Sequence, residues 1–431
     1  MLLLPASFVL VVDGQARPVA SAKSAGPAVV TGPDGSYAVA APRMSIDDLR
    51  VGPVLAGSSV VWTTSDARSR FLTVEQTDPD GTTKTLYVMP RRIRYPGPVA
   101  LVASPTRIVL VREGPPGPCD LLTNRCKNHL GALLAGEPGK PLRRVAGIEQ
   151  RFRGYRGCRR GSMGIDLQIT GLQLSGDWAG YARRVACRDP QRSDRLELVL
   201  HNLRTGVRRV IDRRTTYLEV NGYLLLAGRL AAYQSPATGK IVVADIRTDA
   251  IEYAPAHVSG WASLDEDGTL AGAAFRSGSL NGWLSWTSPK APSLHRLPVK
   301  ASIFSSEPLL IAKHRIASVR RLGWKGHELA ITDLHGHKQT VARFTRPEEL
   351  DDFAFNGDRI AWASSTWRPY EGHEDDGLPY RCDSGLRVLA RAPIVEVHPI
   401  DQLTRIPTEK LPVLPAPRDP AGDPPSCSTG D

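Results

Sequence analysis

The chain concentrates side chains suited to anion binding in one short segment, RFRGYRGCRR, at residues 151–160. Arginine guanidinium groups form paired hydrogen bonds with phosphate, sulfate and carboxylate oxygens, and they stack on aromatic rings. We therefore interpret the segment as a candidate anion-binding element. Its contact residues are Arg151, Arg153, Tyr155, Arg156, Arg159 and Arg160. The alternative is a solvated, arginine-rich loop without a dedicated partner.

The charge distribution agrees with this interpretation. The net charge is +11, and residues 140–214 carry 18 Lys+Arg against 7 Asp+Glu, which accounts for all of it. The rest of the chain is neutral. A cationic sector of this kind favours binding to an anionic polymer or an acidic protein. Nucleic acid is a partner in principle, but an exported protein would not be expected to meet it.

A second group of polar and aromatic residues lies in WRPYEGHEDDGLPY, residues 367–380. Carboxylates beside a histidine could bind a divalent cation, but four adjacent side chains cannot all point at one ion, because calcium loops alternate their ligands. A solvated acidic loop is therefore the favoured interpretation, and no metal or cofactor is predicted. The candidate contact residues of this loop are Trp367, Tyr370, His373, Glu374, Asp375 and Asp376.

A sequence pattern that recurs along the chain, called the repeated phrase below, predicts the strands and turns that position these segments. FNGDRIAWAS at 355–364 repeats the pattern of LSGDWAGYAR (174–183), LAGRLAAYQS (226–235) and LAGSSVVWTT (55–64): an apolar residue, a glycine turn, then an apolar run closing on an aromatic residue. With three weaker copies, seven units follow one another at spacings of 48, 71, 52, 40, 45 and 44 residues. A period of 40–50 residues is typical of a β-propeller blade.

The second half of each unit predicts two further strands around a tight polar turn, as in RLELVLHNLRTGVRRVI at 195–211. The fold class is therefore all-β, a single β-propeller with seven four-stranded blades. Only 44–50 and 346–353 could form short helices. Two β-sandwich domains are the alternative architecture. A hairpin at 27–42 could complete a blade or add one, which would change the blade count.

On these repeats the chain resembles the TolB-like and WD-type propeller superfamilies over roughly residues 50–400. The resemblance is architectural. The repeats lack the Gly-His and Trp-Asp dipeptides of WD repeats, and SLDEDG (263–268) is one residue too long for a sialidase Asp box. The resemblance implies the fold and no functional residue, because propellers include enzymes, lectins and scaffolds.

Strand parity places the insertions. In an up-and-down blade the first and third turns lie at one end, whereas the second loop and the connection to the next blade lie at the other. The long insertions at 114–128, 145–164 and 365–384 all fall at this second end. Insertions gathered on one face commonly mark a binding face. Drift of unimportant loops is the alternative.

The six cysteines can pair at that same end. Proximity favours the disulfides Cys119–Cys126, Cys158–Cys187 and Cys382–Cys427, with none left over. Such an even set is typical of an oxidising compartment. A zinc site is the rival interpretation, and no CxxC spacing supports it.

Four regions are predicted: a signal peptide at 1–22, an N-terminal extension or hairpin at 23–50, the propeller at 51–400, and a Pro-rich tail at 401–431 tied back by a disulfide. The apolar start followed by Ala20, Ser21 and Ala22 resembles a secretory signal without its basic region. A buried first strand is the alternative. No stretch reaches the length of a membrane span.

The sequence contains no GxSxG, HExxH or P-loop motif. We therefore expect an extracytoplasmic, monomeric, non-enzymatic recognition or scaffold module whose loop-bearing face binds an anionic polymer or a protein. Two alternatives stay open. A propeller hydrolase or lyase would cluster buried polar residues in the central channel beneath the loops, and a structural part of an envelope assembly would expose an apolar patch.

Overall fold

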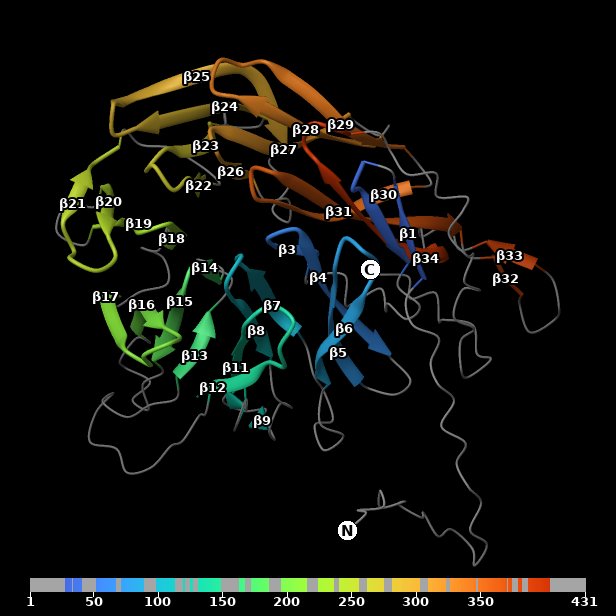
Figure 1. Ribbon diagram of the computed structural model, residues 1–431, viewed down its shortest axis with the longest axis horizontal. Helices are drawn as coiled ribbons and strands as arrows, with labels where there is room; N and C mark the ends of the chain where they lie inside the picture. The colour runs from blue at the N-terminus through green and yellow to red at the C-terminus, as the bar shows by residue number, and fades with distance from the viewer. Residues whose placement is uncertain are drawn as a thin grey trace, which may run out of the picture.

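The computed structural model shows a ring of twisted antiparallel sheets, each with its first strand nearest the centre (Figure 1). It describes residues 28–32, 34–40, 52–66, 71–88, 98–112, 119–120, 125–126, 131–148, 163–166, 172–185, 195–214, 224–235, 240–255, 262–274, 281–302, 309–322, 326–345, 348–369, 371–373, 379–381 and 387–403. These residues form strands and turns and contain no helix, so none of them forms a helix able to cross a membrane.

Seven sheets form seven blades, which confirms the predicted propeller. Blade 1 consists of β3 (Val54–Ala56), β4 (Ser59–Asp66), β5 (Phe71–Thr77) and β6 (Thr83–Val88); blade 2 of β7 (Pro98–Ala103), β8 (Ile108–Arg112), β11 (Gly131–Gly136) and β12 (Arg143–Ile148). Blade 3 begins with β13 (Met163–Asp166) and β14 (Gln173–Ser175), which both pair with β15 (Trp178–Val185), and continues with β16 (Arg195–Asn202) and β17 (Arg208–Arg214).

The next three blades are regular. Blade 4 consists of β18 (Leu224–Ala227), β19 (Leu230–Gln234), β20 (Ile241–Asp245) and β21 (Ile251–Tyr253); blade 5 of β22 (Ala262–Leu264), β23 (Leu270–Ala274), β24 (Asn281–Ser288) and β25 (Ala291–Ser302); blade 6 of β26 (Leu310–Ala312), β27 (Arg315–Arg321), β28 (His327–Asp333) and β29 (Lys338–Phe344). Each strand pairs antiparallel with the next one in its blade, as an up-and-down blade requires.

Blade 7 joins the two ends of the chain. Its inner strands are β30 (Glu348–Phe355), β31 (Arg359–Pro369) and β34 (Arg387–Pro399), and β2 (Tyr37–Ala40) and β1 (Ala28–Thr31) complete it from the N-terminal side. β2 pairs with β34 from Tyr37↔Val397 to Ala40↔Ile394. The N-terminal hairpin therefore completes the last blade and adds no eighth one, and this sheet has five strands.

Side chains between the blades form the core. Trp62 and Trp362, the aromatic residues of the repeated phrase, are 1% and 0% exposed. Trp62 packs with Tyr37 and Val397 at the junction of blades 1 and 7, and Trp362 packs between blades 6 and 7. The aromatic residue recurs because a four-stranded sheet has two faces to bury, and large side chains fill the wedge between neighbouring blades.

The two ends of the ring differ. The first and third turns of the blades are tight and lie at one end, which we call the tight-turn face. Gly57, in the first of these turns, has a φ of 67°, which glycine adopts without the penalty of a side chain. The second loops and blade connections lie at the opposite end, which we call the loop face. There β9 (Cys119–Asp120) pairs with β10 (Arg125–Cys126), and β32 (Glu371–His373) pairs with β33 (Pro379–Arg381).

Candidate functional site

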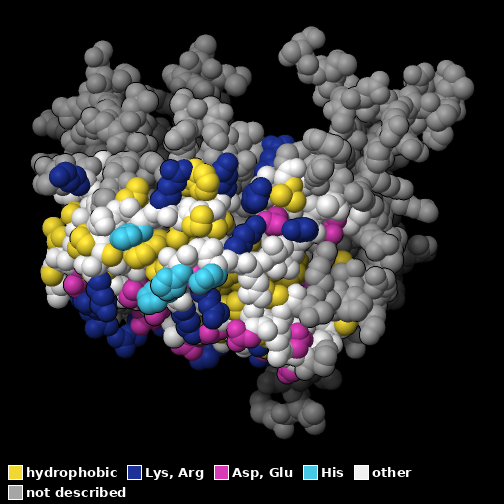
Figure 2. Space-filling view, turned by 90° about the horizontal axis from the view of Figure 1, so that it is seen from above, with side chains coloured by type: hydrophobic (Ala, Val, Ile, Leu, Met, Phe, Trp, Pro, Cys, Tyr) yellow, Lys and Arg dark blue, Asp and Glu magenta, His cyan; other side chains and the backbone are white. Residues whose placement is uncertain are grey.

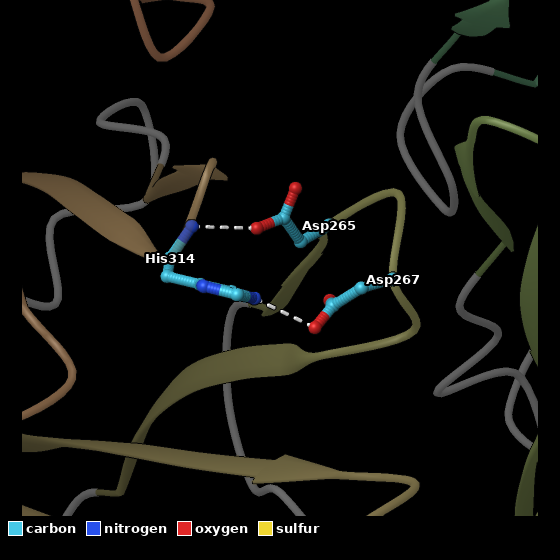
Figure 3. Close-up of side chains that lie close together, drawn as sticks. All are labelled: Asp265, Asp267 and His314. Atoms are coloured by element: carbon cyan, nitrogen blue, oxygen red, sulfur yellow. Dashed lines mark hydrogen bonds and ion pairs between the residues drawn. The ribbon is translucent and has the colours of Figure 1, made fainter.

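On the tight-turn face, three ionisable side chains from blades 5 and 6 converge (Figure 3). Asp265 and Asp267 lie in the turn between β22 and β23, and His314 lies in the turn between β26 and β27. Their potential ligand atoms lie within 4.8 Å of one another, so the group has the composition of a small metal site.

The hydrogen bonds indicate a structural role for this group. The carboxylate of Asp265 accepts the backbone N–H groups of Lys313 (3.2 Å) and His314 (2.8 Å) from the neighbouring blade. The Nε2 atom of His314 lies 2.7 Å from Oδ2 of Asp267. Because the ligand atoms already serve these contacts, the three residues fasten blade 5 to blade 6.

In other turns on this face, charged side chains also form hydrogen bonds and ion pairs within the fold. Asp245 accepts the backbone N–H groups of Arg247 and Thr248 and forms an ion pair with Arg229 at 2.7 Å. These hydrogen bonds, first of all the one from Arg247, lower the pKa of Asp245 to about 2. Blade 6 has a corresponding pair, His337–Asp333. In a view of the ring from its rim, basic, acidic and histidine side chains lie intermixed along the lower edge (Figure 2).

Two carboxyl groups on β30, the innermost strand of blade 7, have raised pKa values, in contrast to Asp245. In the β30–β31 ladder Leu350 opposes Ser364 and Asp352 opposes Ala363, so Asp351 is the extra residue of a β-bulge. Oδ1 of Asp351 accepts a hydrogen bond from the Ser365 hydroxyl at 2.7 Å. Oδ2 is buried and has no hydrogen-bond partner in the described part of the chain. Bulges often redirect a side chain beside a functional site.

Burial raises the pKa of Asp351 to about 7, and the negative charges of Glu349 and Glu348 act in the same direction. Burial likewise raises the pKa of Asp352 to about 7, although its carboxylate accepts backbone hydrogen bonds from Phe353 and from Gly52 of the adjoining blade. Two carboxyl groups that are half protonated near neutral pH therefore lie at the closure of the ring. Such a group can donate a proton or a hydrogen bond.

The sequence of this segment allowed a short helix. The pattern RPEELDDF could form two helical turns at 346–353, whereas residues 348–355 form strand β30, in agreement with the predicted all-β class. Pairing with β31 overrides the local helix preference of Glu and Leu. No sequence motif pointed to Asp351 as a candidate, because its environment depends on the bulge. His314 and Asp267 also lacked a signal, since they are far apart in the sequence.

The predicted anion-binding residues Arg151, Arg153, Tyr155, Arg156, Arg159 and Arg160 lie outside the described residues. They belong to the connection between β12 and β13. In the acidic loop, Trp367 is on β31 with its backbone paired to Leu389, and His373 is on β32 opposite Pro379. Tyr370, Glu374, Asp375 and Asp376 lie outside the described residues.

Of the six cysteines, the described residues include Cys119 and Cys126. Their backbones are direct partners across the β9–β10 pair. Directly opposed residues of an antiparallel pair have Cα atoms about 4.5–5.5 Å apart, a separation that a disulfide can bridge. Cys158, Cys187, Cys382 and Cys427 lie outside the described residues, so the three disulfides stay predictions.

The structural neighbours of this chain are distant from it in sequence. No family model matches the chain, and no curated protein matches its sequence significantly. Similar solved structures include TolB from Acinetobacter baumannii (15% identity, TM-score 0.37, 80% of each chain covered) and oligogalacturonate lyase in complex with manganese (11% identity, TM-score 0.43, 87% of this chain and 96% of that one).

The β-propeller domain of the trilobed protease from Pyrococcus furiosus is also similar, at 10% identity and a TM-score of 0.41, over 78% of this chain and 91% of that domain. Strand order and blade closure by themselves define the class, a seven-bladed β-propeller. This fold alone leaves the activity undetermined.

Proposed function

We propose that this chain is an extracytoplasmic, non-enzymatic recognition module that binds an anionic polymer or an acidic protein partner on its loop face. The observation that carries the proposal is the contrast between the two ends of the ring. On the tight-turn face, Asp265 fastens neighbouring blades and Asp245 fastens its own turn through hydrogen bonds from backbone N–H groups. The insertions, including the arginine-rich connection, leave from the other end.

Two exposed arginines of the flanking blades lie at the other end of the ring and are not part of this surface. Arg143 begins β12 and Arg208 begins β17, and the fourth strand of each blade starts at the tight-turn face. The even cysteine count and the apolar N-terminus support the extracytoplasmic part of the proposal.

The test is salt-dependent elution from immobilised dextran sulfate. We expect the native chain to elute at higher salt than a variant with Arg151, Arg153, Arg156, Arg159 and Arg160 all changed to Gln. Each arginine that contacts the polyanion releases a counterion, so the slope of log affinity against log salt should fall by up to about 4 if all five contact it.

A matched control loses the same charge elsewhere. It carries Arg247→Gln, Lys290→Gln, Arg296→Gln, Lys300→Gln and Arg320→Gln, all at exposed positions of blades 4, 5 and 6. We expect this control to elute close to the native chain. If both variants elute equally early, retention reflects net charge alone and the arginine connection is no recognition element.

A hydrolase or lyase is the second candidate, and one observation favours it. Asp351 combines a pKa of about 7 with a buried oxygen on the innermost strand, which suits a general acid. Turnover of an anionic polysaccharide, lost in Asp351→Asn and kept in Asp358→Asn, would support this candidate over the first one.

A further inference from the structure

One partly buried arginine near the loop face has no counter-charge among the described residues. Arg112 is the last residue of β8, the second strand of blade 2. Its backbone lies between Pro98 of β7 and Ala132 of β11. Its Nε and Nη1 atoms are shielded from solvent and have no hydrogen-bond acceptor in the described part of the chain.

Two other partly buried arginines of the propeller form ion pairs with carboxylates. Arg107, at the opposite end of the same strand pair, forms ion pairs with Asp177 at 2.7 Å and Glu137 at 3.6 Å. Arg209 pairs with Asp249. Among the described residues, no carboxylate forms an ion pair with Arg112. An unpaired charge held away from water is costly, and folded proteins normally offset it with an opposite charge and hydrogen bonds.

The described surroundings of Arg112 are mostly apolar. The side chains beneath it belong to the apolar cluster shared by blades 1 and 2, which includes Leu110 and Ala132. Tyr87, on the outer strand β6 of blade 1, packs against this cluster. The positive charge of Arg112 acts to lower the pKa of the Tyr87 phenol. Burial raises the pKa of the Tyr87 phenol, so it is neutral and can donate a hydrogen bond but supplies no negative charge.

We propose that Arg112 is the anchor of an oxyanion-binding site between blades 1 and 2 at the loop face, with Tyr87 as its neighbouring hydroxyl donor. The ligand is a carboxylate, sulfate or phosphate group, because these anions offer several oxygens to a guanidinium and neutralise its charge. The inference deepens the proposed function, on which it rests: it assigns one subsite for the charged group of the anionic partner. Water could satisfy the N–H donors but would leave the charge uncompensated.

The test measures thermal unfolding of the full chain with sodium phosphate, sulfate or acetate, each compared with sodium chloride at equal ionic strength. We expect at least one oxyanion to raise the Tm of the native chain by about 3 °C at a concentration near one hundred times its Kd. The three salts distinguish the possible sources of the oxyanion. If none raises the Tm above chloride, the proposal is wrong.

Arg112→Met keeps the volume and removes the charge. We expect this variant to be at least as stable as the native chain in chloride, because it removes an unpaired buried charge, and to lose the oxyanion-dependent rise. Arg112→Lys keeps the charge without the planar fork and should show a smaller rise. Arg143→Met, an exposed arginine of the same blade, is the control and should keep the full rise.

Two outcomes would overturn the inference. A full rise in Arg112→Met would place the anion elsewhere. Failure of Arg112→Met to fold, or a large loss of stability in chloride, would mean that Arg112 stabilises the fold without a ligand. Neither outcome depends on dextran sulfate retention. A chain that keeps its retention but fails this test retains the recognition function and loses only this subsite.

Discussion

The bulge residue Asp351 makes stability depend on pH in a direction opposite to that of the acidic side chains on the tight-turn face. Its pKa rises from an ordinary value of 3.8 to about 7, because the folded chain buries the carboxyl group beside Glu348 and Glu349. Between these two values the folded state holds a proton that the unfolded state has released. Stability from this group is therefore present at low pH and is lost as pH rises toward 7.

The size of the stability change follows from the pKa shift of Asp351. One pKa unit corresponds to about 1.4 kcal/mol, so about three units give a penalty of about 4 kcal/mol above pH 7. This value is an upper bound, since the side chain is partly exposed and solvent screens its charge. Replacing Asp351 with Asn keeps the shape and removes the titration. We expect Asp351→Asn to match the native chain near pH 4 and to become progressively more stable than it up to pH 7, with a constant difference above that.

The assay is urea unfolding of both chains at half-unit intervals from pH 4 to pH 9. The difference between the two curves removes groups away from the bulge, such as His201, whose pKa burial lowers to about 4. It reports Asp351 together with the neighbouring Asp352, whose pKa the charge of Asp351 also raises. Asp358→Asn is the control, since Asp358 is an exposed carboxylate of the same blade as Asp351 and pairs with Lys313 of blade 6 at 2.6 Å. A stability difference that does not change between pH 4 and pH 8 would refute the assignment of a raised pKa to Asp351.

Two further predictions concern the turns. In Gly326→Ala the new Cβ would lie 1.9 Å from the carbonyl oxygen of Phe344 at a φ of 127°, so we expect a loss of about 3 kcal/mol or more in chemical denaturation; Gly57→Ala, at a φ of 67° with nothing within 4 Å, should cost only about 1–2 kcal/mol. Asp265→Ala leaves backbone N–H donors of the neighbouring blade without an acceptor and should cost about 3 kcal/mol. Asp267→Ala removes an exposed ion pair with His314 and local hydrogen bonds from Thr269, and it should cost only about 1 kcal/mol. Equal losses for the two aspartates would contradict the assignment of Asp265 as the main contact between the blades.

The repeats determined the architecture from the sequence alone. Each copy of the phrase encodes a tight turn between two buried strands, and the aligned glycines Gly57, Gly176, Gly228 and Gly357 all adopt positive φ. The aromatic residues Trp62 and Trp362 are buried as predicted. These features depend on neighbours within a few residues, so their signal survives in a linear sequence. The alternating strand direction within each repeat also predicted which end of the ring carries the insertions.

Only the tertiary structure decided how the ring closes. β2 pairs with β34 across more than three hundred residues, and no local pattern specifies that register. The raised pKa of Asp351 and the unpaired guanidinium of Arg112 likewise depend on what other strands place around them. A short acidic run and a terminal strand arginine have many ordinary counterparts in sequence. What distinguishes them is a buried polar atom without a partner among the described residues. Burial is a property of the packed blades and not of the residues themselves.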